Sequence, residues 1–203
     1  MLFDKFDISL FDKIEYEKWY SLMSRERRGR TDAYRKKSDR LRSVAADMLI
    51  RKNISKICGA SPESISIETK PGGKPYAVGI DIEFNISHSG DFAVLAIGKK
   101  QVGIDTEIIR PFSLKLAKRV FDKVELEYLF GYMPEDFDFV KEPDGDMQYR
   151  FYQLWTAKEA YGKYTGEGLL SFSAKEIPQC KKGIIRSAAS DEYYVSVYCG
   201  DKS

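Results

Sequence analysis

The stretch VGIDTEI at residues 102–108 alternates acidic side chains with apolar or uncharged ones. Successive side chains of a β-strand point to opposite faces, so a strand here places Asp105 and Glu107 on one face and Ile104, Thr106 and Ile108 on the other. Two adjacent carboxylates repel each other unless a cation lies between them, and Mg²⁺ favours carboxylate oxygens together with substrate phosphates. The stretch therefore predicts a strand with a candidate metal-binding face, although an amphipathic strand with two solvated acids would show the same pattern.

The composition is that of a globular chain whose charges are unevenly distributed. Of the 203 residues 43% are hydrophobic and 13% aromatic, enough for one large domain or two small ones. The net charge is only +2, yet residues 25–52 hold eleven Lys or Arg against four acids, and residues 122–146 hold nine acids against two Lys. We therefore expect one region that attracts anions and another that repels them.

Cysteine usage and hydropathy favour a soluble cytoplasmic protein. Cys58, Cys180 and Cys199 are spaced too widely for a disulfide framework or a zinc motif. Residues 1–22 mix charged with apolar side chains, unlike a signal peptide, and no apolar run approaches the ~20 residues needed to cross a bilayer. We expect no membrane partner.

A second stretch, FNISHS at residues 84–89, predicts a strand that ends in a turn at residues 89–91. It contains His88, the only histidine of the chain. A lone histidine is more often structural than functional, but a strand end beside two serines favours a functional role. Residues 92–97 and 101–108 predict two further strands that pair antiparallel through a tight turn, and this hairpin would hold His88 near the acids.

Two features of the first half could bind phosphate. Residues 39–52 have the apolar spacing of an amphipathic helix, and Arg42 and Ser43 fall close to its first turn, where backbone N–H groups and basic side chains can hold an anion. A solvated helix face is the alternative. Lys74 lies in a turn with two glycines and two prolines, whose backbone can approach a ligand closely, although an ordinary surface turn also explains it.

Residues 151–164 predict a helix on which Trp155, Glu159 and Lys163 share one face, with Gly166 and Gly168 at its end. The simple alternative is a surface ion pair between Glu159 and Lys163, worth only ~0.2–0.5 kcal/mol. Other patterns predict a strand and a helix within residues 1–22, helices capped by Ser24 and Ser113, a strand at 65–68, a helix at 124–132, an acidic surface loop at 134–146, and strands at 183–187 and 193–198 that close a second sheet.

Three motifs occur in order: NISHS at 85–89, VGIDTE at 102–107 and WTAKEAYGK at 155–163. Together they resemble the signature of the 4′-phosphopantetheinyl transferases, in particular the long monomeric type that activates peptide and polyketide synthetases. Each motif alone is weak evidence, but the ordered set is specific. With the turn around Lys74 and the basic segment before residue 39, the resemblance covers roughly residues 20 to 175.

The resemblance implies roles for particular residues. Asp105, Glu107 and Glu159 would hold Mg²⁺, or Mn²⁺, on the pyrophosphate of coenzyme A. Glu159, Lys163 and His88 would be catalytic, with Glu159 accepting the proton of the attacking hydroxyl directly or through a metal-bound water. The residues expected to bind coenzyme A are Arg27, Arg30, Arg42, Lys74, Ser87, His88 and Lys163.

Two departures from the family pattern bear on these roles. Thr106 replaces an aliphatic residue between the acids, which matters little because it faces away from them. Gly162 lies inside the predicted helix at a cost of ~1 kcal/mol relative to Ala, so it weakens the positioning of Lys163.

The resemblance also implies a reaction and a fold. A serine of an apo acyl or peptidyl carrier protein would attack the β-phosphate of coenzyme A in line and expel 3′,5′-ADP. The fold would be α+β, with two similar halves at 1–104 and 105–203 related by a pseudo-two-fold axis and an active-site cleft between them. We expect a monomer that uses coenzyme A as its donor and does not bind nucleic acid.

Two rival interpretations compete with the enzyme. A nucleic-acid or anionic-ligand binding module could use the basic segment 25–52, with steeply salt-dependent affinity. This module would leave the three acids unexplained, because a metal-free acidic cluster repels nucleic acid. An idle relative that only binds a carrier protein as a scaffold is the second rival, and the presence of all three acids with Lys163 argues against it.

Overall fold

The apolar stretch Phe92–Gly98 forms β5, the central strand of a three-stranded antiparallel sheet. Its neighbours are β1 (Leu2–Asp7) and β4 (Glu83–Ser89), in the order β1-β5-β4. Both edges of β5 are therefore occupied, and the predicted pairing of β5 with β6 (Val102–Ile108) is wrong: β6 belongs to a second sheet. This computed structural model describes residues 1–70, 73–132, 144–166, 183–189 and 192–200.

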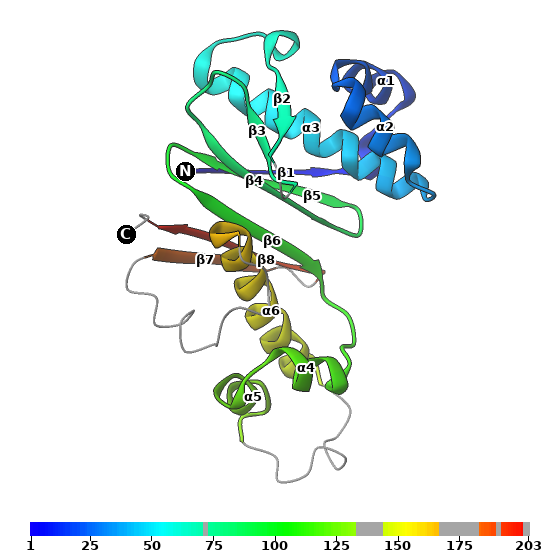
Figure 1. Ribbon diagram of the computed structural model, residues 1–203. Coiled ribbons are helices and arrows are strands. Elements are labelled where there is room, and N and C mark those ends of the chain that lie inside the picture. Colours follow the sequence, from blue (N-terminus) through cyan, green and yellow to red (C-terminus); the bar gives the residue numbers. More distant parts are fainter. Residues whose placement is uncertain (71–72, 133–143, 167–182, 190–191, 201–203) are drawn as a thin grey trace. The chain divides into compact units, whose positions relative to one another are not determined.

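The chain divides into two units, Met1–Val102 and Gly103–Ser203 (Figure 1). The boundary predicted from the sequence, after residue 104, lies two residues further along the chain. His88 falls in the first unit, whereas Asp105, Glu107 and Glu159 fall in the second, so no single hairpin joins them.

The long helix α3 (Lys37–Cys58) covers the sheet of the first unit. It includes the predicted helix 39–52 and continues to Gly59, whose φ of 74° forms a left-handed cap. Val44, Ala45, Met48 and Leu49 are buried against the sheet, as their spacing predicts. The smaller elements of this unit are α1 (Lys13–Leu22), α2 (Arg25–Ala33), β2 (Ile67–Thr69), β3 (Pro75–Ala77) and two 3₁₀ turns, η1 (Ile8–Leu10) and η2 (Pro62–Ser64).

The predicted cap of α2 is confirmed, because the Ser24 hydroxyl accepts a hydrogen bond from the Arg27 backbone N–H at 3.3 Å. The turn that contains Lys74 connects β2 and β3, which pair antiparallel as a short hairpin. Gly73 takes a φ of 90°, which only glycine adopts easily. The Ser24 cap thus determines where α2 begins, and Gly73 allows the chain to reverse between β2 and β3.

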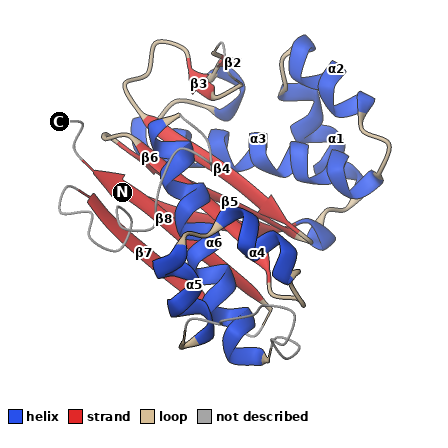
Figure 2. Cartoon of the chain, turned by 60° about the horizontal axis from the view of Figure 1, so that its bottom comes forward, coloured by secondary structure: helices blue, strands red, loops and turns tan. Residues whose placement is uncertain are grey.

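The second unit has a sheet in the order β6-β8-β7, with β7 (Gly183–Ala189) antiparallel to β8 (Tyr193–Gly200). The helix α6 (Gly145–Thr165) packs on this sheet, and the shorter helices α4 (Leu114–Val120) and α5 (Lys123–Phe130) complete the unit (Figure 2). The C-terminal strands predicted to close a second sheet are confirmed.

The helix α6 is longer than the predicted 151–164. Asp144 caps its start by accepting a hydrogen bond from the Met147 N–H at 2.7 Å, and Gly166, with a φ of 81°, ends it as expected. Gly145 and Asp146, predicted in the acidic loop, are therefore helical. Residues 134–143 of that loop and Gly168 lie outside the described residues.

Gly103 allows the backbone of α6 to lie directly on β6. A Cβ atom at this position would lie 1.9 Å from the Ala160 carbonyl oxygen and 2.6 Å from the Tyr164 nitrogen. Only a glycine fits such an approach without moving the helix. This contact brings the acidic end of β6 next to the part of α6 that carries Glu159 and Lys163.

Buried hydroxyl groups also tie this unit together. The Thr106 hydroxyl donates to the Tyr194 carbonyl at 3.2 Å, and the hydroxyls of Thr156 on α6 and Ser196 on β8 lie 2.7 Å apart. The polar residue between the two acids is thus satisfied by the neighbouring strand, which explains why the second unit accommodates Thr106 in its interior.

The combination of helices with small antiparallel sheets confirms the α+β class. A pseudo-two-fold relation between the units stays a prediction. No helix within the described ranges is long and apolar enough to cross a membrane.

Candidate active site

Asp105 on β6 and Lys163 on α6 form an ion pair, with Lys163 Nζ 2.7 Å from Asp105 Oδ1. The Asp105 side chain is 6% exposed and that of Lys163 is 30% exposed. A carboxylate this deeply buried needs a positive partner or a metal, so the alternative of a solvated acid does not apply to Asp105. The ion pair joins a strand to a helix and is not the within-helix surface pair considered from the sequence.

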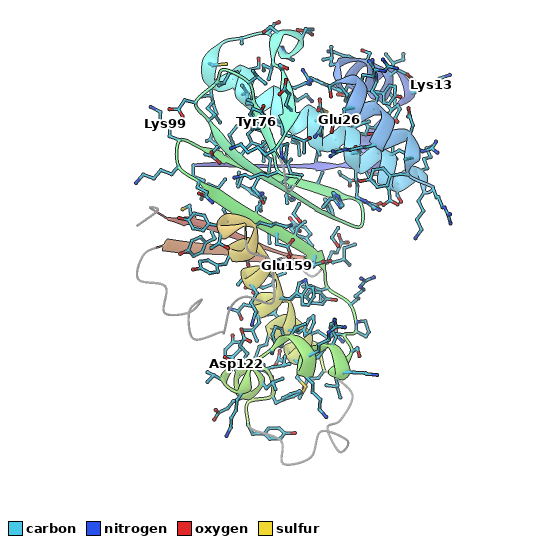
Figure 3. All side chains as sticks on the ribbon, in the orientation of Figure 1. Lys13, Glu26, Tyr76, Lys99, Asp122 and Glu159 are labelled. Atoms are coloured by element: carbon cyan, nitrogen blue, oxygen red, sulfur yellow. The ribbon has the colours of Figure 1, made fainter. Side chains whose placement is uncertain are left out.

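Glu159 lies half-buried in the middle of α6 (Figure 3). Burial raises its pKa above the ordinary value, the negative charges of Asp105 and Glu107 raise the pKa further, and the Lys163 ammonium lowers it. The three predicted acids and Lys163 therefore share one electrostatic environment. Within the part of the chain that the structure describes, this is where the second and third motifs meet.

These acids fit a hard divalent cation by their chemistry. They supply carboxylate oxygens, and their mutual repulsion is what a cation would relieve. In the arrangement described here, no group of three or more His, Cys, Asp or Glu side chains among the described residues is already gathered around a point where a metal could bind. The Lys163 ammonium lies on Asp105 instead, so metal binding requires side-chain rearrangement.

A buried ion pair anchors α6 one residue before Glu159. Lys158 Nζ lies 2.7 and 2.9 Å from the two carboxylate oxygens of Glu125 on α5, and both side chains are almost fully buried. Burial raises the pKa of Glu125, whereas the Lys158 ammonium and the capping bond to Asp122 lower it. Removing either partner would leave a buried charge unpaired, so this pair fixes the position of α6 against α5. Its importance was not predicted from the sequence.

The first unit contains a cavity of about 280 Å³, close to the lower end of small-molecule sites. Ala46 and Ile50 on α3 and Ile86 on β4 give it apolar walls, while Arg27 and Arg30 on α2 and His88 on β4 bring positive or titratable groups. The remaining lining residues are Tyr34, Asp39, Ser43, Gly73, Pro75 and Asn85. This cavity thus combines apolar walls with two arginines and a histidine.

The arginines of the cavity are held differently. Arg27 Nε lies 2.8 Å from Asp47 Oδ1, without hydrogen-bond geometry, and Asp47 Oδ2 accepts a 2.5 Å hydrogen bond from Arg51 Nε. Asp47 is fully buried, so this network orients Arg27 from behind. Arg30 pairs with Glu26 at 2.6 Å on the surface, a contact that contributes little and that an anion can displace.

Four of the seven predicted coenzyme A residues do not line the cavity: Arg42, Lys74, Ser87 and Lys163. Arg42 donates hydrogen bonds to the Gly90 carbonyl and, at 2.5 Å, to Asp39, so it holds the turn between β4 and β5. Lys74 pairs with Glu83 at 2.9 Å across the β3–β4 connection. Among the described residues the structure thus brings Arg27, Arg30 and His88 to one cavity, while Ser87 is buried next to His88 in β4.

Several residues were missed from the sequence. Tyr34 and Asn85 line the cavity, and Asp47 supports it, whereas Ser43, which also lines it, was predicted as a candidate phosphate-binding residue. Two of them carried a readable signal: Asn85 begins the NISHS motif, and Asp47 interrupts an otherwise apolar helix face four residues before Arg51.

The sequence is similar to that of a 4′-phosphopantetheinyl transferase from Bacillus subtilis, with 34% identity over 200 residues that cover 91% of this chain and 85% of the relative. The chain belongs to the 4′-phosphopantetheinyl transferase superfamily. Residues 101–201 match the family described as the 4′-phosphopantetheinyl transferase superfamily, and residues 12–100 match the one described as 4′-phosphopantetheinyl transferase, N-terminal.

Other relatives of the superfamily agree. The 4′-phosphopantetheinyl transferase Sfp of Bacillus subtilis strain 168 is 35% identical over 156 residues, 76% of this chain and 65% of the relative. A 4′-phosphopantetheinyl transferase from Bacillus pumilus is 34% identical over 166 residues, 79% of this chain and 67% of the relative. The resemblance inferred from the three motifs is confirmed, and the long type is consistent with these matches.

Proposed function

We propose that this transferase moves the 4′-phosphopantetheine arm of coenzyme A to a serine of an apo acyl or peptidyl carrier protein, with Mg²⁺ or Mn²⁺, and releases 3′,5′-ADP. The observation that carries this proposal is the shared environment of Asp105, Glu107, Glu159 and Lys163. A monomeric cytoplasmic enzyme with two halves related by a pseudo-two-fold axis is part of the same proposal.

The adenosine end of coenzyme A is assigned to the cavity of the first unit. The apolar side chains of Ala46, Ile50 and Ile86 would contact a purine, and Arg27 and Arg30 would pair with the 3′-phosphate. The buried contact with Asp47 keeps Arg27 oriented. Arg30 would only have to leave an exposed ion pair, with Glu26, to bind the phosphate. His88 and Ser87 would complete this site.

Arg42 and Lys74 remain part of the proposed coenzyme A site, although both have partners within the protein. Arg42 would act by fixing the β4–β5 turn next to His88 and not by touching the ligand. Lys74 would leave its partly exposed pair with Glu83 to reach a phosphate.

The diphosphate end is assigned to the acids of the second unit. A divalent ion held by Asp105, Glu107 and Glu159 would offset charge on the diphosphate oxygens. Lys163 lies close enough to the same acids to contact a phosphate bound there, and phosphoryl transfer depends mainly on such positioning and charge compensation.

In the transfer itself, the serine Oγ forms a bond to the β-phosphorus while the bond from that phosphorus to the bridging oxygen breaks. The bridging oxygen leaves with the α-phosphate as 3′,5′-ADP. Glu159, when ionised, would accept the serine proton directly or through a water. Lys163, Lys74 and His88 compensate the negative charge that develops on the leaving group.

The nucleic-acid module is less well supported. Of the basic residues in 25–52, Arg27 and Arg51 face Asp47, Arg42 faces Asp39, and Arg30 faces Glu26. These contacts partly neutralise four arginines, although other basic residues of the segment stay exposed. The module is less well supported mainly because it leaves the three acids of the second unit unexplained.

A panel of apo carrier domains tests the proposal. The protein is incubated with coenzyme A and Mg²⁺, and intact mass spectrometry records whether one phosphopantetheine arm is added to a carrier serine. We expect an adduct on at least one carrier, none with a chelator, and none on a carrier whose acceptor serine is alanine. Absence of adduct on every carrier, together with tight binding of DNA or RNA, would contradict the enzyme and support the binding module.

A further inference from the structure

Lys163 compensates the charge of a cluster that holds three carboxylates. Its ammonium lies 2.7 Å from Asp105 Oδ1 and lowers the pKa of Glu159, whereas Asp105 and Glu107 raise that pKa. The lysine thus acts as a monovalent cation for the cluster. A divalent ion on Asp105 would stand at contact distance from this ammonium, where two positive charges repel strongly in a partly buried site.

Lys163 has the freedom to leave Asp105. Its side chain is 30% exposed, five times the 6% of Asp105, and it lies in the last turn of α6, three residues before the Gly166 cap. A lysine carries its charge on a flexible four-carbon stem, so the ammonium can move several ångströms without displacing the helix. Asp105 is fixed in the strand, so the lysine is the partner that moves.

We propose that Lys163 and a divalent cation exchange at Asp105, so that ion binding releases the Lys163 ammonium toward the diphosphate. The proposal rests on the proposed function for the identity of the anion, but the exchange itself concerns only the cation. Under this exchange, Lys163 competes with the metal for Asp105 when no anion is bound. When the diphosphate is bound, Lys163 and the metal both bind it. By linkage, coenzyme A and the metal then strengthen each other's binding.

The first test is a titration of the full chain with Mn²⁺ alone, followed by electron paramagnetic resonance of the free ion. We expect Lys163→Met to bind Mn²⁺ on the order of tenfold more tightly than wild type, because the competing ammonium is gone. The matched control is Lys123→Met, which removes the same charge from an exposed position on α5 and should bind Mn²⁺ like wild type. Equal or weaker Mn²⁺ binding by Lys163→Met would overturn the exchange.

The linkage gives a second readout. Saturating coenzyme A should tighten Mn²⁺ binding to wild type by a larger factor than to Lys163→Met, since only wild type gains a released ammonium for the diphosphate. An equal factor for both proteins would contradict the proposal.

A measurement on wild type alone covers the case in which Lys163→Met does not fold. Amine acetylation, mapped by mass spectrometry with and without Mg²⁺, should show faster modification of Lys163 when Mg²⁺ is present and no change at Lys123. Unchanged or slower modification of Lys163 would overturn the exchange. Tighter Mn²⁺ binding by Lys163→Met, together with no carrier loading by wild type, would leave the exchange standing and remove the proposed function. Carrier loading by wild type, together with equal Mn²⁺ binding by both proteins, would overturn the exchange and leave the proposed function standing.

Discussion

Glu159 lies half-buried beside two other carboxylates, so its ionisation costs free energy in the folded protein. Its pKa is raised above the ordinary value, mainly by burial. The folded state therefore binds the Glu159 proton more tightly than the unfolded state does. The stabilisation from that proton is present below the unfolded pKa and is lost as the pH rises through the folded pKa.

The raised pKa of Glu159 predicts that Glu159→Gln is more stable than wild type at neutral pH when no divalent ion is present. The gain should shrink as the pH falls through the raised pKa of folded Glu159, and it should be gone below the ordinary glutamate pKa, where wild type is protonated in both states. Urea unfolding of both proteins at several pH values measures the difference. Glu127→Gln, at an exposed position on α5, is the control and should change stability little at any pH. A Glu159→Gln variant that is less stable at neutral pH would contradict the repulsion.

A second prediction concerns the contribution of Arg30 to coenzyme A binding in the cavity. Arg30 lines the cavity, so Arg30→Gln should weaken coenzyme A binding by roughly tenfold or more, the size of a lost hydrogen bond to a charged group. Arg35 is exposed and absent from the cavity lining, so Arg35→Gln should bind coenzyme A like wild type. Calorimetric titration compares the three proteins.

Unchanged affinity in Arg30→Gln would place the 3′-phosphate elsewhere. Arg42→Gln should instead loosen the β4–β5 turn, which Arg42 holds through the Gly90 carbonyl. Arg42→Gln should therefore lower the stability of the protein more than it weakens coenzyme A binding.

At the scale of elements, the contact between β6 and α6 determines the geometry of the acid cluster. Gly103→Ala should disturb it, because the new Cβ would meet backbone atoms of Ala160 and Tyr164 that cannot rotate away. We expect a loss of about 1–3 kcal/mol in the free energy of unfolding, as for an overpacked core, and a larger loss of transfer activity as α6 shifts.

Gly145→Ala is the matched control for this variant. The position lies at the start of the same helix, and an added Cβ meets nothing within 4 Å. It should keep full stability and activity in thermal unfolding and transfer assays. Gly103→Ala with wild-type activity would show that β6 and α6 tolerate a wider spacing than the structure has.

The sequence predicted some helix ends correctly, but it did not predict which strands pair. Ser24 and Gly166 mark helix ends through local backbone chemistry, so the start of α2 and the end of α6 were predicted correctly, whereas α6 begins six residues before its predicted start. The partners of β5 could not be read in the same way. Alternation shows that a segment is a strand, but pairing with β1 depends on a contact across some ninety residues, which the sequence pattern does not encode.

At the scale of the whole molecule, the predicted site residues divide between two units. The acids and Lys163 were predicted together because the motifs VGIDTE and WTAKEAYGK resemble one family, and the structure gives them one electrostatic environment. The ion pairs that orient them were not predictable. Glu125 and Lys158 are 33 positions apart, and nothing in either local sequence shows that each is buried against the other.

The uneven charge of the chain also has a structural meaning that composition alone did not show. Buried Asp47 faces two arginines of the basic segment 25–52, whereas other basic residues of the segment are exposed: Arg25, Arg35, Lys36, Lys37 and Arg40. Arg27, Arg30 and His88 of the first unit also line its cavity.

The most direct test of the acid cluster is the rate at which wild type, Glu107→Gln and Glu159→Gln load one apo carrier protein from coenzyme A in excess Mg²⁺, followed by intact mass spectrometry. We predict steady addition of the phosphopantetheine arm by wild type and almost none by either variant, with both variants folded and still binding coenzyme A through the cavity. Loading at the wild-type rate by both variants would show that the metal and the transfer chemistry lie elsewhere.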